Sequence, residues 1–387
     1  MAKTYTARWL FPIDAPPLER GTITIAHDKI VAVEPHGTRT PDVDLGNVAI
    51  LPGFVNAHTH LDLTGARGLC PPKSDFTRWL RMVVAFRRTC TPEQAQADIA
   101  QGISECLRFG ATLIGDIQSR DAWAAFFNLE CRAVTFFELI GLSDERAKSA
   151  AAQYSWLLRS PHAPTWNILY GLSPHAPYSV GIRMYELAMR QPHLVATHLA
   201  ESREELELFH SLTGPFVDFL QELKVWEPDN LVASPSDVLR MFPRGLFVHC
   251  NYLDPATPFL STQTVVVCPR THAAFGHPHH PFPKMNVRVA LGTDSLASNP
   301  DLDILAEARF LRRHYPEVTP GAIMRMLTLN GAQALGFHAV TGSLRPDKSA
   351  DLVVVPLPNE DRNDPHDLVL DSELPISRVM FRGEWRV

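Results

Sequence analysis

The sequence lacks several patterns that would place it in a particular class of protein. None of its six cysteines forms a C-x-x-C pair, so neither a thiolate zinc knot nor a disulfide framework is indicated. Positive charge is in deficit, because the formal net charge is −6, and this predicts no nucleic-acid or anionic-membrane partner. No apolar run reaches membrane-spanning length, and the first residues hold no signal-peptide core. We therefore expect a cytoplasmic protein with a small-molecule substrate, and leave open whether it is a homodimer.

Apolar runs of strand length alternate with helical stretches through the middle of the chain. The eight runs cover residues 54–60, 111–116, 131–138, 166–173, 193–199, 246–251, 264–268 and 287–294. Helical stretches include 92–109, 144–158, 203–223 and 301–314. Near-continuous apolar strands suit a parallel sheet that is buried on both faces, and eight of them suit a closed barrel. An open doubly wound sheet is the alternative, but residues 56–65 are not the Gly-rich phosphate turn typical of it. We therefore predict an α/β fold, with a (β/α)8 TIM-type barrel over residues 53–341.

The two ends of the chain are also rich in strand patterns. Residues 22–33 read as a β-hairpin with its turn at 27–29, and residues 342–355 and 376–387 read as strands. A single hairpin buries too little apolar surface to be stable alone, whereas strands from both ends can pack together. We therefore predict one composite β-sandwich domain from residues 1–52 and 342–387.

Histidine and aspartate side chains stand at the ends of several of the apolar runs. His58 and His60 close the first run, and because alternate residues of a strand point to one face, both imidazoles project together. His198 and Asp294 end the fifth and eighth runs. Taken singly, each histidine fits an ordinary polar side chain and Asp294 fits a helix cap. Because the strand ends of a barrel meet at its active site, the four together predict one divalent metal ion, Zn²⁺ first and Fe²⁺ as the alternative.

Two further polar residues are predicted to act beside this ion. Glu201 lies three residues after His198, where it can move protons without being a ligand, although it also fits the acidic start of a helix. His249 ends the sixth run and could bind the metal or polarise the reacting group. The fourth run, which leads to His175, contains no lysine that could be carbamylated to bridge a second ion. One metal ion is therefore the simpler prediction.

Several segments resemble those of a known family, the amidohydrolase superfamily, and in particular its mononuclear deaminase and chlorohydrolase branch. They are Pro52-Gly-Phe-Val-Asn-Ala-His-Thr-His-Leu-Asp62, His198-Leu-Ala-Glu201, Val248-His249, Gly292-Thr-Asp-Ser295 and Gly342-Ser-Leu-Arg-Pro-Asp-Lys-Ser-Ala-Asp351. The resemblance runs through nearly the whole chain. It implies the same barrel and composite β module, with the metal held by the residues that match His58, His60, His198 and Asp294.

The resemblance also implies a mechanism. Metal coordination lowers the pKa of a bound water towards about 7, and the hydroxide attacks a heteroaromatic carbon. The match of Asp294 accepts a proton, the match of Glu201 protonates the neighbouring ring nitrogen, and the match of His249 orients the nucleophile or stabilises the adduct. An amine then leaves as ammonia. Hydrolysis of a C–Cl bond or a cyclic amide by the same centre is the alternative, and a non-catalytic binding scaffold is a second one.

The substrate contacts are predicted from a lid-like segment, residues 74–88, and from two later motifs. In the lid, Trp79 could stack on the substrate or anchor the lid, and Arg87 or Arg88 could bind a substrate anion. Ser173-Pro-His-Ala-Pro-Tyr178 resembles the adenosylhomocysteine and aminodeoxyfutalosine deaminases, whose matching histidine contacts substrate, so His175 is the leading contact. Cys268-Pro-Arg-Thr-His272 adds Arg270 and His272, with loop stabilisation as their alternative role. Arginine in the lid, where the adenosylhomocysteine enzymes carry a glutamate, favours aminodeoxyfutalosine with its benzoate end.

Overall fold

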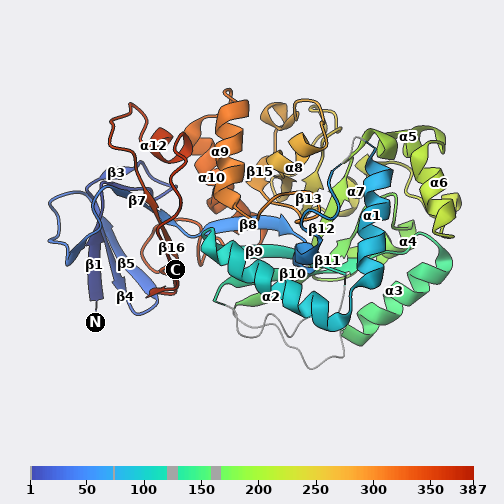
Figure 1. The fold of residues 1–387 in the computed structure, drawn as a ribbon, viewed down its shortest axis with the longest axis horizontal. Helices are drawn as coiled ribbons and strands as arrows, with labels where there is room; N and C mark the ends of the chain where they lie inside the picture. The colour runs from blue at the N-terminus through green and yellow to red at the C-terminus, as the bar shows by residue number, and fades with distance from the viewer. Residues whose placement is uncertain (1, 73–74, 120–129, 158–166) are drawn as a thin grey trace.

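A computed structural model describes residues 2–72, 75–119, 130–157 and 167–387 (Figure 1). Residues 74, 158 and 166, which end three of the predicted segments, lie outside the described residues. Within the described part of the chain, no helix combines the length and the apolarity that a membrane span requires.

Eight parallel strands form the central sheet, and each pairs with the next one along the chain, as predicted. They are β8 (Phe54–Thr59), β9 (Ala111–Gln118), β10 (Arg132–Leu139), β11 (Ile168–Pro174), β12 (Leu194–Leu199), β13 (Gly245–His249), β14 (Gln263–Val267) and β15 (Arg288–Leu291). Nearly all their residues are buried, because helices cover the outer face and apolar side chains fill the inside. The predicted α/β barrel is confirmed.

Helices surround this sheet (Figure 1). They are α1 (Phe76–Thr89), α2 (Pro92–Arg108), α3 (Asp144–Leu157), α4 (Ile182–Met189), α5 (Arg203–Ser211), α6 (Pro215–Glu222), α7 (Pro235–Met241), α8 (Pro269–Ala274), α9 (Ile304–His314), α10 (Pro320–Leu327), α11 (Leu329–Ala334) and α12 (Asp367–Leu370). Capping residues fix where several of these helices begin. The side chain of Thr91 accepts a hydrogen bond at the start of α2, and Asp303 does so at α9.

The helical stretch predicted over residues 203–223 is divided into two helices, α5 and α6. The first ends where Leu212 takes a left-handed backbone conformation with φ 54°. Gly214 then adopts φ 92°, which a glycine accepts readily, and Pro215 starts the second helix. The apolar periodicity continues across this break, so periodicity alone did not reveal it.

The barrel closes between β15 and β8 through hydrogen bonds to the turn that follows β15. The described residues of these two strands form no backbone ladder, although the strands are in contact. Instead, the backbone N–H groups of Thr293 and Asp294 both donate to the carbonyl of His58 at 3.1 Å. The side chain of Asn56 adds two bonds to Thr293, from Nδ2 to Oγ1 at 2.7 Å and to Oδ1 from the backbone N–H at 3.1 Å. The contact between β8 and β15, which we call the seam, is therefore made at the carboxyl ends of these two strands.

Strands from both ends of the chain form two further sheets, at the left of Figure 1. The first has the order β5-β4-β1-β6, built from β1 (Ala2–Thr6), β4 (Thr22–Ala26), β5 (Lys29–Glu34) and β6 (Val43–Asp44). The second has the order β18-β17-β16-β7-β2-β3, built from β2 (Trp9–Leu10), β3 (Leu18–Glu19), β7 (Val48–Pro52), β16 (Leu352–Pro356), β17 (Arg378–Phe381) and β18 (Glu384–Trp385). Because β7 and β16 pair in the second sheet, the two ends share one structure, which supports the composite domain proposed from residues 1–52 and 342–387.

Candidate metal centre

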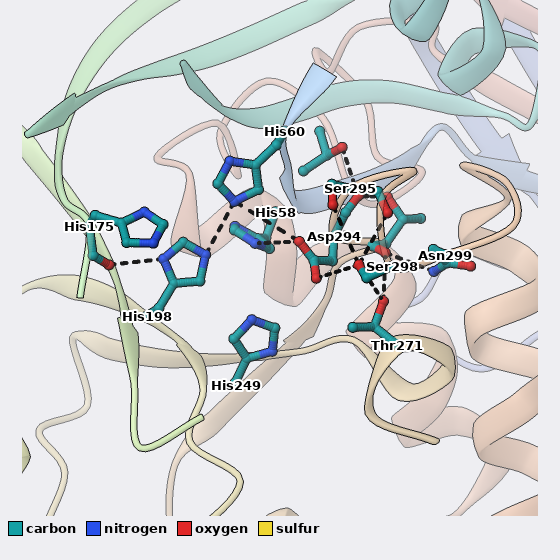
Figure 2. Close-up of polar contacts among 12 residues, drawn as sticks. His58, His60, His175, His198, His249, Thr271, Asp294, Ser295, Ser298 and Asn299 are labelled. Carbon is teal, nitrogen blue, oxygen red and sulfur yellow. Dashed lines mark hydrogen bonds and ion pairs between the residues drawn. The ribbon is translucent and has the colours of Figure 1, made fainter. Parts of the chain in front are cut away.

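Three histidines and one aspartate meet at the carboxyl end of the barrel (Figure 2). His58 lies in β8, His60 follows this strand directly, His198 lies in β12 and Asp294 follows β15. One ring nitrogen from each histidine lies within 4.8 Å of the others. Oδ1 of Asp294 is 3.5 Å from Nε2 of His58 and 4.0 Å from Nε2 of His60. The four residues predicted as metal ligands are therefore brought to one point.

Each histidine of the cluster directs one ring nitrogen towards the other two. Nδ1 of His198 donates to the carbonyl of His175 at 2.9 Å, which leaves Nε2 as the free nitrogen. That atom lies 3.2 Å from Nε2 of His60, so a proton or a cation has to lie between the two. Nε2 of His58 is buried and has no hydrogen-bond partner among the described residues. Burial lowers the pKa of both His60 and His198 well below the usual value, which keeps them uncharged and able to bind a cation.

Asp294 supplies negative charge to this cluster. Its backbone takes a left-handed conformation with φ 59°, which a non-glycine residue adopts only when its surroundings hold it there. Ser298 Oγ donates to Oδ2 at 2.8 Å, and Thr59 Oγ1 donates to the backbone carbonyl at 3.0 Å. Burial by itself raises the pKa of Asp294, but the nearby imidazoles of His58 and His249 outweigh burial and hold the pKa well below its usual range. The side chain is therefore a carboxylate.

Glu201 and His249 face each other beside the cluster. Oε1 of Glu201 lies 3.3 Å from Nε2 of His249. Ala200, directly after β12, and His249, the last residue of β13, both have positive φ, 47° and 67°. Burial, the charge of Asp294 and that of Glu205 raise the pKa of Glu201 well above its usual value, which favours the protonated acid. Burial lowers the pKa of His249 to about 3, so its imidazole is neutral.

Several residues that support these two were not found from the sequence. Glu205 accepts the backbone N–H groups of Ala200 at 3.1 Å and of Glu201 at 2.8 Å, and so holds the bend after β12. Asn251 Nδ2 donates to the carbonyl of Glu201 at 2.8 Å. Nε2 of His280 donates to the carbonyl of His249 at 2.7 Å. Of these three residues, only Asn251 stands at the end of an apolar run, the sixth, and could have been found from that position.

The centre lies at the bottom of a cavity of about 400 Å³. We define its floor as the residues His60, His175, His198, Glu201, His249 and Asp294. We define its rim as the lining residues of helices α1, α3 and α6, which are Phe76, Trp79, Leu80, Val83, Val84, Arg87, Arg88, Arg146, Ser149, Ala150, Gln153, Phe219 and Leu220. The rim is mostly apolar. A buried floor with polar groups beneath a largely apolar opening is typical of small-molecule sites.

Three of the predicted substrate contacts line this cavity. Nδ1 of His175 bonds Glu138 at 2.7 Å, and Nε2 lies 3.3 Å from Tyr178 Oη. Trp79 also belongs to the rim. The indole N–H of Trp79 donates to the carbonyls of Cys70 and Ala297, both at 3.1 Å, and so anchors α1. This contact agrees with the anchoring role that the sequence left open.

Arg87, the third of these contacts, is held by acidic side chains. Its Nη1 donates to Oε2 of Glu138 at 2.8 Å, and its Nη2 donates to Oδ1 of Asp62 at 3.4 Å. Part of its charge is therefore already compensated. Glu138 was not singled out from the sequence, although it ends the third apolar run and so had the same signal as the metal ligands.

Arg270 and His272 do not belong to the lining of this cavity. Arg270 pairs with Asp301 at 2.7 Å and reaches towards Glu307 at 3.7 Å. His272 contacts Asn251 at 3.0 Å and the carbonyl of Pro278 at 2.6 Å. Both residues hold the loops that surround the floor, which is the alternative role that the sequence left open.

The donor set fits a divalent cation. Three imidazole nitrogens and one carboxylate oxygen are ligands that Zn²⁺ and other borderline cations take up, and the buried, unpartnered nitrogen of His58 is what such an ion would satisfy. Since the set contains no thiolate, soft-metal clusters are not favoured.

Comparison with known proteins agrees with this site. The model of the amidohydrolase family matches residues 49–386. A 5-methylthioadenosine/S-adenosylhomocysteine deaminase of Moorella thermoacetica is 30% identical, over 92% of this chain and 85% of that protein. An aminodeoxyfutalosine deaminase of Nitratiruptor sp. is 28% identical, over 88% of this chain and 87% of that protein.

A solved structure shares the fold. The adenosine deaminase of Xanthomonas campestris with bound zinc superimposes with a TM-score of 0.77 at 24% identity, and the match covers 99% of this chain and 92% of the other. The chain therefore belongs to the amidohydrolase family, and its histidine cluster is a divalent metal site.

Proposed function

We propose that this protein is a metal-dependent aminohydrolase that deaminates a purine-like or other heteroaromatic amine, with an adenosine-type nucleoside as its substrate. The observation that carries the proposal is the cluster of His58, His60, His198 and Asp294, which lies beside Glu201 at the bottom of a cavity of about 400 Å³. The relatives named above, which are deaminases of adenosine-type compounds, support it.

His58, His60, His198 and Asp294 would hold one cation, and Zn²⁺ suits three imidazoles and a carboxylate best, with Fe²⁺ as the alternative. Such a cation lowers the pKa of a water molecule, so that a strong nucleophile is available near neutral pH. Asp294, which is ionised, accepts a proton from the attacking water. His249 orients the nucleophile and stabilises the negative charge that develops on the added oxygen.

Glu201 delivers a proton to the ring nitrogen beside the reacting carbon, and its raised pKa makes it a proton donor near neutral pH. The same carboxyl lies 3.3 Å from His249, so the proton donor and the group that stabilises the oxygen act from one side of the substrate. After addition, Asp294 passes the proton that it took from the water to the amine, which leaves as ammonia, and the proton released from the added oxygen returns to Glu201. The buried position of Glu201 keeps bulk water away from this transfer.

The rim supports a nucleoside that carries an anionic group, such as aminodeoxyfutalosine with its benzoate. Arg88 on α1 and Arg146 on α3 both line the cavity, and neither side chain forms an ion pair within the described residues. A carboxylate that reached this edge would meet two guanidinium groups, which bind carboxylates in bidentate geometry. Apolar side chains between the floor and these arginines would cover an aromatic ring.

Mass spectrometry of a panel of aminopurine nucleosides, incubated with metal-loaded enzyme, tests the reaction. We expect an increase of about one mass unit and release of ammonia, because an amino group is exchanged for oxygen. If the enzyme with full metal occupancy deaminates no compound of the panel, the proposal is contradicted. Chloride release from a chlorinated heterocycle would instead favour the chlorohydrolase alternative, and a preparation that binds no divalent ion would favour a scaffold.

A double variant, Arg88→Ala with Arg146→Ala, tests the rim. We expect the KM for a carboxylated nucleoside to rise by about tenfold or more, because its carboxylate loses the contact with the two arginines. The KM for adenosine, which carries no carboxylate, should change little. Arg81→Ala is the matched control, because Arg81 lies on α1 and pairs with Glu222 at the surface. Equal effects on both nucleosides would show that the arginines do not read a carboxylate.

A further inference from the structure

A continuous line of polar contacts runs from helix α1 to the floor of the cavity. Arg87 on α1 donates from Nη1 to Oε2 of Glu138 at 2.8 Å. The other oxygen of Glu138, Oε1, lies 2.7 Å from Nδ1 of His175. Glu138 stands near the end of β10 and is 6% exposed, so both contacts are shielded from solvent. One carboxylate thus joins the rim helix to His175, which the sequence analysis predicts as the leading substrate contact.

The contact between Glu138 and His175 determines which nitrogen carries the proton. Arg87 and His175 together outweigh burial and hold the pKa of Glu138 below its usual range, so the side chain is an acceptor. Nδ1 of His175 must then carry the hydrogen, which makes Nε2 the atom that faces Tyr178 and the cavity. Without the carboxylate, the ring is free to rotate or to protonate at the other nitrogen.

We propose that Glu138 is a positioning residue that fixes the ring orientation and the proton position of His175 and, through Arg87, holds helix α1 over the cavity. The proposal rests on the proposed function only in that it takes His175 as a substrate contact. His198, the predicted metal ligand beside His175, is held independently of Glu138. The backbone carbonyl of His175 accepts hydrogen bonds from Nδ1 of His198 at 2.9 Å and from the backbone N–H of His198 at 2.8 Å. Loss of the Glu138 side chain removes neither bond.

Three variants separate positioning from simple stabilisation. Glu138→Leu removes the acceptor of His175 and one partner of Arg87. Arg87→Met removes the link to α1 but leaves Glu138 beside His175. The double variant removes both members of the Arg87–Glu138 pair, so that neither charge of this pair is left unpaired, while Asp62 loses Arg87 as it does in Arg87→Met. Arg81→Met is the control, because this α1 arginine pairs with Glu222 at 2.7 Å and does not line the cavity.

Two measurements need no substrate. In ¹⁵N-histidine-labelled protein, with the resonances of His175 assigned by a His175→Gln variant, the wild type and Arg87→Met should show the hydrogen on Nδ1. Glu138→Leu and the double variant should lose that pattern. Amide hydrogen exchange in α1 should quicken in Glu138→Leu and in Arg87→Met, and should stay at the wild-type rate in Arg81→Met.

Kinetics supply the third measurement. With the best substrate of the panel, Glu138→Leu should raise KM by about tenfold while kcat falls less than about threefold and the metal content stays the same, because the lost interaction is one of substrate binding. An unchanged Nδ1 pattern in Glu138→Leu, or a fall in metal content equal to the loss of activity, overturns the proposal. If the wild type deaminates nothing, the proposed function fails, but the spectra and the exchange rates still decide the role of Glu138.

Discussion

The floor of the cavity takes its side chains from the ends of barrel strands, whereas the rim is formed by helices α1, α3 and α6. On the floor, hydrogen bonds from other residues orient His198, Asp294, Glu201 and His249. The rim consists of apolar side chains with arginines at its edge. The floor is therefore fixed before a substrate arrives, and the rim is the part that selects which molecule enters. Changes at the predicted metal ligands, at Glu201 or at His249 should alter kcat or metal binding, whereas changes on the rim or at His175 should alter KM.

Removal of the metal should have the largest effect. A chelator that strips the ion should abolish deamination, and Zn²⁺ should restore it, because only the cation supplies a nucleophile at neutral pH. Plasma emission spectrometry of the protein measures occupancy alongside activity. Full activity in a preparation without a divalent ion would contradict the proposed role of the floor.

Glu201→Gln should lower kcat by roughly a thousandfold, since the amide cannot donate the proton that the ring nitrogen needs. The side chain keeps its shape, so metal content and KM should change little. Steady-state kinetics, with metal analysis of the same sample, measure this. A loss of metal in proportion to the loss of rate would show instead that Glu201 supports the ligands.

Glu307 should make stability depend on pH. Burial raises its pKa to about 8, so the folded protein binds a proton that the unfolded chain releases near pH 4.5. The free energy of unfolding should then fall by roughly 3 kcal/mol between pH 5 and pH 8 from this group. Glu307→Gln should be less stable at pH 5, because its amide cannot accept both the Arg270 and Asn299 bonds, yet its denaturation midpoint should vary less with pH. An unchanged slope contradicts this assignment.

Asn56→Ala should weaken metal binding by about tenfold or more, because the side chain joins β8 to the turn that carries Asp294. Competition with a fluorescent chelator measures the affinity. Thr64→Ala, a buried change outside the seam, is the control for stability. If both variants lose affinity only as far as they lose stability, the seam has no specific role in holding the ligands.

Trp79→Phe should have the smallest effect, a rise in KM of several-fold with kcat unchanged. The variant leaves the carbonyls of Cys70 and Ala297 without a donor, which costs about 1–3 kcal/mol of stability. Trp79→Leu loses the aromatic face as well. A much larger KM in Trp79→Leu than in Trp79→Phe would assign stacking on the substrate to this residue, and equal values would leave it as an anchor.

Much of the floor could be predicted because polar residues at the ends of apolar runs are visible in one dimension. This rule found His58, His60, His198, His249 and Asp294, while Glu201 was found by its position three residues after His198, and the structure places all six together. Glu138 follows it too and was overlooked, because a single carboxylate after an apolar strand is common. The rule did not extend to Arg270 and His272, since a motif next to the site does not tell whether its side chains point inward.

The sequence by itself determined the alternation of strands and helices, and hence a barrel whose strand ends carry the ligands, because hydrophobic periodicity and strand order are local properties. Only the tertiary structure decided how the seam between β8 and β15 is closed, which acid holds His175, and which arginines face the cavity. These features depend on side chains far apart in the chain, and their directions follow from packing and backbone bends that no local pattern records.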